Sequence, residues 1–316
     1  MKASQELDGG VAEYLSTVPP APEFSADSLR LIRERRAAMP EPELSGQVEH
    51  TSVVVPADPP VPMRIHRPKG VSGVLPCIYS IHGGGYVARS AFREDARFDA
   101  WCRQLGCIGA SVEYRLGPEW PYPAALNDCY QGFKWLVENA DELGFDRERL
   151  GVFGASAGGG LAAALSLMAR DLGDVRPAFQ ALLYPMIDDR QETRSSQWDD
   201  VPVWNPASNT FGWQSYLGEL YGTPDVPAYA AVSRATDLRG LPPTYIMVGT
   251  LDAFLDENIA FAQRLIHAGV PTDLHVYAGG SHGFDIPHCH ADVSVRARTE
   301  VDHWLASRLA TTATRG

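Results

Sequence analysis

The chain has 316 residues, of which 45% are hydrophobic and 21% charged, which suits one large α/β domain or a domain with a smaller appendage. Its formal net charge of -12 argues against a nucleic-acid-binding surface, because such a surface needs a concentrated basic face. No early segment joins a basic start to an apolar run, and no stretch is long enough to span a bilayer, so we expect no membrane attachment and a cytoplasmic location.

After an N-terminal region of about fifty residues, strand-like and helix-like segments alternate along the chain. That region has a helical pattern broken by five prolines and precedes a first strand at 51–55. The expected strands are then 75–81, 107–114, 149–153, 179–184, 244–248 and 273–277. The expected helices are 92–105, 123–143, 161–171, 256–268 and 293–309. This alternation predicts a mostly parallel sheet with helices on both faces.

Two segments do not fit the alternation, residues 1–50 and the aromatic-rich residues 188–226. The second is either a surface excursion or a lid that closes over the active site together with the first. We favour the lid, because an α/β sheet presents its site at the strand C-termini, where such pieces would lie. The predicted organisation is therefore a cap segment at 1–50, a core at 51–187, a cap insertion at 188–226, and the rest of the core at 227–316.

The run Gly154 to Gly160 has the pattern of a nucleophile elbow. Strand-like residues precede it, a helical pattern follows it, and Gly154, Ser156 and Gly158 complete G-x-S-x-G. Small neighbours let the turn close and leave the serine hydroxyl exposed. A plain tight turn would also collect small residues, so the motif needs support from elsewhere in the chain.

A nucleophilic serine needs a histidine to take its proton and a carboxylate to orient that histidine. In α/β-hydrolases the order is serine, acid, histidine, each after a strand. Asp252 follows the strand at 244–248, and His282 follows the strand at 273–277 through a small-residue loop. We therefore expect Asp252 and His282 to act with Ser156.

Other acids and histidines were weighed for the same roles. Asp256 and Glu257 are close to Asp252, but Asp256 opens a helix and is explained as its N-cap. His288 and His290 flank a cysteine, yet no nearby ligand set completes a metal site. Structural roles suffice for His267, on a helix, and His275, on a strand. The five cysteines are scattered, so reduced thiols without assigned chemistry are expected.

A glycine-rich run, His82-Gly83-Gly84-Gly85, ends the strand at 75–81. Bare N–H groups of consecutive glycines can crowd a small oxyanion, and the N–H of Ala157 would add a further donor. A phosphate-binding loop is the alternative, but no Gly-Lys-Ser/Thr follows. His82 is interpreted as a residue that orients this loop.

These motifs together resemble the hormone-sensitive-lipase-like α/β-hydrolases, the bacterial family IV carboxylesterases. The resemblance spans about residues 50 to 310. The runs that carry it are His82-Gly83-Gly84-Gly85, Tyr114-Arg115-Leu116-Gly117-Pro118-Glu119, Pro121-Tyr122-Pro123-Ala124-Ala125, Gly154-Ala155-Ser156-Ala157-Gly158-Gly159, Asp252 with Asp256-Glu257, and His282-Gly283-Phe284. Residues 231–238 and 241–245 further resemble the acetyl-esterase and heroin-esterase-like members.

The resemblance implies an α/β-hydrolase fold with a helical cap, formed by the N-terminus and an insertion. It implies the triad Ser156, Asp252 and His282 and oxyanion donors at Gly84, Gly85 and Ala157.

Two positions depart from the family pattern. Ala155 stands where the family often carries Asp, and Gly117 stands where it often carries Ala. Neither change removes a catalytic group, so they bear on substrate preference or local stability.

The expected activity is that of a serine carboxylesterase for small, short-acyl esters, without metal or cofactor. An amidase or lactonase would use the same triad. A non-catalytic receptor of the same fold would lack the base, and His282 is present here. The expected partner is a small-molecule ester, and a homodimer is an option by analogy only.

Overall fold

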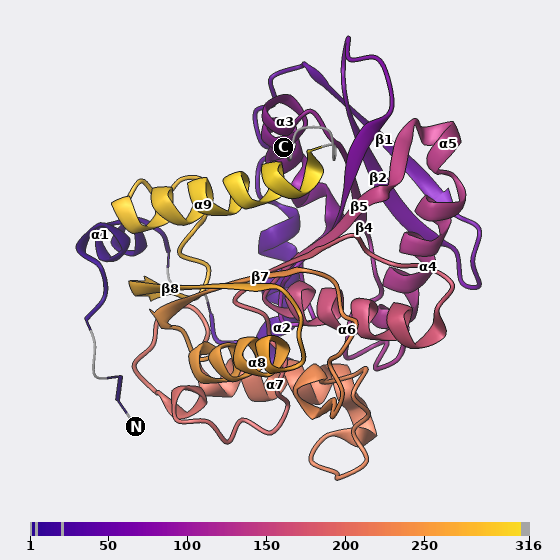
Figure 1. Cartoon of the computed structure of the whole chain (residues 1–316). Helices are drawn as coiled ribbons and strands as arrows, with labels where there is room; N and C mark the ends of the chain where they lie inside the picture. The colour runs from indigo at the N-terminus through magenta and orange to yellow at the C-terminus, as the bar shows by residue number, and fades with distance from the viewer. Residues whose placement is uncertain (1, 4–5, 20–21, 311–316) are drawn as a thin grey trace.

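The computed structural model describes residues 2–3, 6–19 and 22–310, and within them the chain forms one eight-stranded sheet (Figure 1). The strand order is β1-β2-β4-β3-β5-β6-β7-β8. The strands are β1 (Val48–Val55), β2 (Val61–Pro68), β3 (Leu75–Ile81), β4 (Ile108–Val112), β5 (Phe145–Ala155), β6 (Gln180–Leu183), β7 (Thr244–Leu251) and β8 (Thr272–Ser281). The six strands from β4 to β8 in this order are parallel, and β2 is antiparallel to both of its neighbours.

Helices cover both faces of the sheet. The α-helices are α1 (Gly9–Thr17), α2 (Ala26–Ala37), α3 (Asp95–Leu105), α4 (Ala124–Glu138), α5 (Ala140–Leu143), α6 (Ala157–Leu172), α7 (Pro206–Leu217), α8 (Leu255–His267) and α9 (Asp292–Leu309). In Figure 1, α9 lies above β7 and β8, and α8 lies below them. α3 packs beside α9, and α4 packs beside α6. This is the two-faced α/β architecture that the sequence predicted.

Burial follows from position in the sheet. Every residue of the central strands β3 and β7 is buried, as expected when helices cover both faces. The edge strands β1 and β8 instead mix exposed and buried residues. Two large apolar clusters form among the described residues, one on each face, so the strand ends between them are held rigidly.

Most expected elements are present, with shifted ends. The helix expected at 123–143 is divided at Asn139 into α4 and α5, and the strand expected at 149–153 extends back to Phe145. The whole of β2 was missed, as was α7 inside the segment 188–226. Asn205 caps α7 through its side chain and Pro206 is the first helical residue, a start signal that was legible in the sequence.

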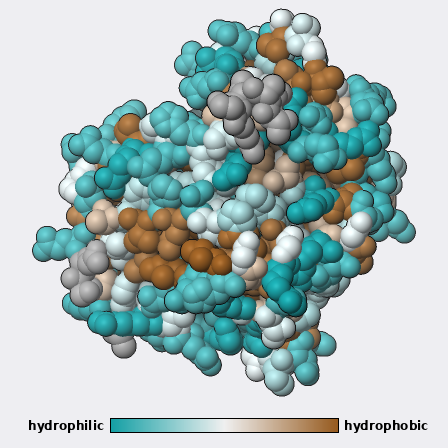
Figure 2. All heavy atoms as spheres, viewed as in Figure 1, coloured by the Kyte–Doolittle hydropathy of each residue, from teal (hydrophilic) through white to brown (hydrophobic). Residues whose placement is uncertain are grey.

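Residues 1, 4–5 and 20–21 of the predicted cap segment lie outside the described part of the chain. Among the described residues, no helix is both long and apolar enough to cross a bilayer. The face seen in Figure 2 is mostly hydrophilic, with a hydrophobic area beside the free edge at β8, where Val276 is exposed. The suggested homodimer stays a prediction.

Candidate active site

Ser156 occupies the sharp turn between β5 and α6. Its backbone has φ 58° and ψ -125°, in the positive-φ region that L-residues rarely adopt. The turn closes because the residues two positions before and after Ser156 are glycines: a Cβ on Gly154 would lie 2.2 Å from the Gly158 oxygen. A Cβ on Gly158 would lie 2.0 Å from the oxygen of Ile81, the last residue of β3. The elbow therefore packs directly against the start of the glycine-rich loop.

The structure brings the three expected polar residues into one chain of hydrogen bonds. His282 Nε2 lies 2.9 Å from Ser156 Oγ, and His282 Nδ1 lies 2.8 Å from Asp252 Oδ2. The other carboxylate oxygen of Asp252 accepts the N–H of Phe254 at 2.9 Å. Asp252 is completely buried, directly after β7, and His282 directly follows β8. The orientation of the imidazole is thus fixed from one side, and its Nε2 faces the serine.

Aromatic side chains enclose the imidazole of His282. Tyr184 and Phe254 meet it edge to face, with ring centroids 4.8 and 5.2 Å away. Trp204, from the segment 188–226, lies 6.2 Å away at a tilt. Such an apolar surround excludes water and strengthens the hydrogen bonds inside it.

The glycine-rich loop passes over the elbow. Gly84 and Gly85 both have positive φ, at 115° and 63°. A Cβ on Gly85 would lie 2.3 Å from the Trp204 ring, so only glycine lets that ring settle on the loop. A Cβ on Gly83 would lie 3.2 Å from Ser156 Cβ, which places the loop beside the serine.

His82 anchors this loop without being available as a base. Its Nδ1 lies 2.8 Å from the Gly83 oxygen, and its ring stacks on Tyr114 at 4.2 Å. The Tyr114 hydroxyl donates to the His82 carbonyl at 2.8 Å. Burial lowers the pKa of His82 to about 4, so the ring is neutral at physiological pH. The geometry agrees with the expected orienting role.

The rejected acids have other partners. α8 begins at Leu255 with Phe254 at its N-cap, so the prediction that Asp256 caps this helix is wrong. Asp256 instead accepts the N–H of Ser195, which fastens a loop to the helix start. Glu257 accepts the N–H of Ile187, and burial raises the pKa of Glu257 well above its usual value.

The rejected histidines on α8 and β8, and the cysteines, have surroundings that explain them without a catalytic role. His275 Nδ1 lies 3.0 Å from a Glu300 oxygen, and His267 is exposed at the end of α8. The cysteines are all free and buried, as expected: Cys77, Cys102, Cys107, Cys129 and Cys289. Burial raises the pKa of Cys77 well above its usual value, which keeps its thiol protonated.

One departure from the family pattern has a structural reason. A Cβ on Gly117 would lie 2.5 Å from the backbone oxygen of Ser215 in α7, so an alanine would force the two segments apart. Gly117 also donates its N–H to the Tyr86 oxygen at 2.9 Å. Nothing in the structure explains Ala155.

A cavity of about 690 Å³ opens onto Ser156 and His282. Its lining combines core residues with residues from both segments foreign to the alternation. Phe24, just before α2, packs edge to face on Trp204 with ring centroids 5.2 Å apart. Phe24 and Trp204, one from each of these two segments, therefore meet in the lining of this cavity.

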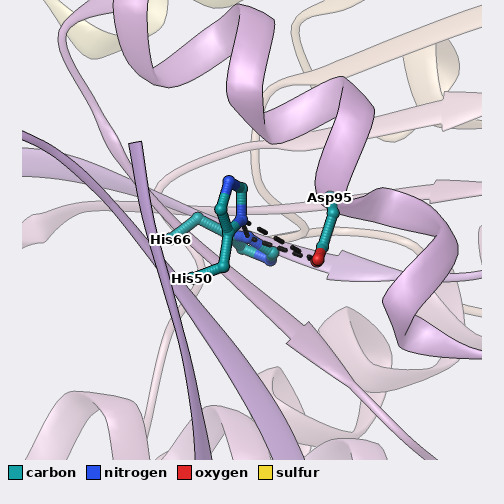
Figure 3. A group of neighbouring side chains, drawn as sticks. All are labelled: His50, His66 and Asp95. Atoms are coloured by element: carbon teal, nitrogen blue, oxygen red, sulfur yellow. Dashed lines mark hydrogen bonds and ion pairs between the residues drawn. The ribbon is translucent and has the colours of Figure 1, made fainter. Parts of the chain in front are cut away.

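Sequence reasoning missed a second polar group, which we call the edge cluster. It consists of His50, His66 and Asp95 (Figure 3), together with Arg64 and Ser111, which hydrogen-bond to them. The two Nδ1 atoms of the histidines are 2.9 Å apart, and each lies within 3.8 Å of an Asp95 oxygen. Arg64 binds both oxygens of Asp95, the closest contact being 2.6 Å. No signal pointed to it, because β2 itself was missed.

The edge cluster fits a metal ion poorly. The ring centroids of His50 and His66 are 5.1 Å apart, so their Nδ1 atoms lie nearly on the line between the rings and point at each other. One therefore donates to the other, and neither directs a lone pair at Asp95. The carboxylate is already neutralised by Arg64. These residues make a hydrogen-bonded network, with no common point for a cation.

Comparisons with known proteins agree with this geometry. A family model described as the alpha/beta hydrolase fold matches residues 78–286. Esterase LipI of Mycobacterium tuberculosis is 32% identical over 267 residues, 82% of this chain and 82% of that protein. Carboxylic ester hydrolase LipN of the same species is 35% identical over 253 residues, 78% of this chain and 66% of that protein.

Solved structures show the same likeness over nearly the whole chain. A bacterial heroin esterase superposes with a TM-score of 0.91 at 39% identity, covering 96% of this chain and 98% of that one. Esterase LipW from Mycobacterium marinum superposes with a TM-score of 0.85 at 33% identity, covering 98% and 99%. The resemblance noted in the sequence is thereby confirmed.

Proposed function

The chain belongs to the α/β-hydrolase family, among its carboxylic ester hydrolases, and we propose that it cleaves small, short-acyl esters through an acyl-enzyme on Ser156. The observation that carries this proposal is the position of His282, which bridges Asp252 and Ser156 by hydrogen bonds of 2.8 and 2.9 Å at the floor of an open cavity.

The reaction follows from these contacts. Ser156 Oγ attacks the ester carbonyl carbon while His282 Nε2 takes the hydroxyl proton. The tetrahedral intermediate collapses, and the leaving alkoxide takes that proton from His282 and departs as the alcohol. Water then attacks the acyl-enzyme, with His282 as base again, and the carboxylic acid is released. Asp252 holds the tautomer and stabilises the imidazolium that forms in each half.

The negative charge of each tetrahedral intermediate needs fixed donors. We assign the backbone N–H groups of Gly84, Gly85 and Ala157 to this oxyanion hole. Gly83, which precedes the two loop donors, lies beside Ser156, and Ala157 is the first residue of α6, where N–H groups lack partners in the helix. The positive end of the helix dipole adds to the same stabilisation.

We further assign residues 1–50 and 188–226 to a cap over the site. Phe24 and Trp204 come from these two segments and narrow the space above Gly85. A cavity of about 690 Å³ is within the range of small-molecule pockets. The enclosure by two aromatic rings supports a preference for short acyl groups.

An acyl-length series tests this function. We expect kcat/KM for para-nitrophenyl esters to be highest for acetate or butyrate and to fall steeply beyond hexanoate. A rate that holds or rises toward decanoate would contradict the short-acyl assignment. A fluorophosphonate should label Ser156 and stop turnover, as located by peptide mass spectrometry. An adduct elsewhere, or activity that survives stoichiometric labelling, would contradict the acyl-enzyme.

A further inference from the structure

One side of the active-site cavity carries three guanidinium groups. Arg36 stands in the last turn of α2, Arg89 follows the glycine-rich loop, and Arg93 lies in the short 3-10 helix η1 (Ala91–Glu94). Among the described lining residues between 11 and 100, the only carboxylate is that of Glu94. Positive charge therefore exceeds negative charge on this side.

Glu94 is fully occupied by two of its neighbours. Its Oε1 lies 3.0 Å from Arg89, and its Oε2 lies 3.2 Å from Arg97. Burial alone would raise the pKa of Glu94, but the two guanidinium charges hold it below the usual value. No negative charge of this residue is left for Arg36.

Arg36 is a cation whose donors are unused within the described chain. Its guanidinium carbon lies 5.3 Å from the centre of the Phe24 ring, and no described carboxylate or carbonyl accepts a hydrogen bond from it. Burial, together with the charge of Arg89, lowers the pKa of Arg36 to about 10. The group is still charged at neutral pH, and it faces the cavity without an anion.

Arg93 fixes the position of Arg36 without neutralising it. Its guanidinium donates to the main-chain oxygens of Arg36, Met39 and Pro40, at 2.6 to 2.9 Å. These contacts hold the C-terminal end of α2 against the core. The Arg36 side chain is therefore presented from a backbone that is tied down.

Arg89 is held beside the oxyanion loop by a strained backbone. Its φ is 98°, which a residue with a side chain rarely adopts. Its Cβ lies 3.1 Å from where a Cβ on Gly84 would be. The second cation thus begins directly next to the loop glycines assigned to the oxyanion hole.

The part of the lining beyond residue 100 carries carboxylates of its own. Asp285 and Asp302 lie there, and both interact with Arg97. Asp285 accepts the Tyr184 hydroxyl at 2.6 Å, and Asp302 accepts the Trp101 N–H at 2.7 Å. Arg36 and Arg93, from α2 and η1, have no such carboxylate partner among the described residues.

We propose that the cavity selects esters that carry a carboxylate, which binds Arg36 with Arg89 alongside. This inference rests on the proposed esterase function and specifies its substrate class. A carboxylate matches the planar fork of a guanidinium with two parallel hydrogen bonds, which a neutral ester of the same shape lacks. Binding it would also give the Arg36 donors an acceptor, which the described chain does not supply.

Matched ester pairs test the proposal. One pair places the charge in the acyl part. It compares mono-para-nitrophenyl adipate with methyl para-nitrophenyl adipate, in which the free carboxylate is masked as a methyl ester. The other places it in the alcohol part: meta-acetoxybenzoate against its methyl ester. For at least one pair we expect Arg36→Met to lower the anionic-to-neutral ratio of kcat/KM by about 10- to 100-fold, mainly through KM.

Two variants control this experiment. Arg35→Met removes the same charge from an exposed neighbour on α2, and it should keep the wild-type ratio. Arg36→Lys should restore part of the ratio, which a mere folding defect would not. If the ratio is unchanged in Arg36→Met for both pairs, or if Arg35→Met loses as much, the proposed carboxylate selection is overturned and the esterase function stands. If the unaltered protein hydrolyses none of these four esters, the esterase function itself is overturned.

Discussion

The chain brings a serine, a histidine and an aspartate together in two places. The two sites share these residue types but differ in access, in the backbone of the serine and in the partners of the carboxylate. In the active site, Ser156 lies on a strained turn, and His282 joins it to Asp252. A cavity reaches the serine, and both oxygens of the aspartate hold groups of the site itself. The carboxylate charge is therefore available to the imidazolium of the proposed reaction.

In the edge cluster the same types are arranged for stability. Ser111 lies within β4, with ordinary strand neighbours, 3.0 Å from His66 Nε2. His66 Nδ1 is bound to His50 and lies 3.7 Å from an Asp95 oxygen that Arg64 already neutralises. Ser111 is completely buried and does not line the cavity. The comparison teaches that access, backbone strain and an unshared carboxylate separate a nucleophile from a core serine.

Replacing each serine by alanine should give the largest contrast. Ser156→Ala should lower kcat for para-nitrophenyl acetate by about 10⁴-fold or more, because the attacking atom is lost. Ser111→Ala should leave kcat unchanged and lower the free energy of unfolding by about 1 to 3 kcal/mol, because His66 loses a buried partner. Full activity of Ser156→Ala, with correct folding by circular dichroism, would sink the assignment of the nucleophile.

Replacing each aspartate by asparagine should separate chemistry from stability again. Asp252→Asn should reduce kcat by about 10³- to 10⁴-fold, because an amide favours the wrong tautomer of His282 and cannot stabilise its cation. Asp95→Asn should retain kcat but lose about 1 to 3 kcal/mol of unfolding free energy, because Arg64 keeps its charge without a counterion. Rate assays and urea unfolding on both variants check this, and reversed effects would contradict the comparison.

The active site was largely predictable from the sequence because its requirements are local. The turn at Ser156 needs small neighbours within two residues, and the strand ends before Asp252 and His282 fix where those residues emerge. Parallel strand order then brings them to one edge of the sheet. The family resemblance added Gly84 and Gly85.

The edge cluster was not predictable because it depends on pairing between strands. β2 carries prolines at 62 and 68, and because proline is uncommon inside strands, the sequence pattern did not indicate a strand there. Only the antiparallel register, in which His50 is opposite His66, brings the two rings together. Similarly, α7 was missed because its composition gives no apolar stripe, and Trp204 reaches the site only through its tertiary packing.

The smallest effect expected is the contribution of His66, in the edge cluster, to the pH dependence of stability. Burial, and then the charges of His50 and Arg64, lower the pKa of His66 well below its usual value. The unfolded chain therefore binds a proton near pH 6.5 that the folded chain refuses, so His66 makes the unfolding free energy fall as the pH drops below that value. His82, with a pKa of about 4, acts in the same direction, whereas the raised pKa of Glu257 opposes both.

A difference between variants separates the His66 contribution from those of His82 and Glu257. In His66→Gln the slope of unfolding free energy against pH, between about 5 and 6.5, should be less steep by up to about 1.4 kcal/mol per pH unit. The matched control His267→Gln replaces an exposed histidine on α8 and should leave the slope as in wild type. Urea unfolding across this pH range measures both. A wild-type-minus-variant difference that does not change with pH would mean that His66 accepts its proton in the folded state, and the edge cluster would then be a titrating site after all.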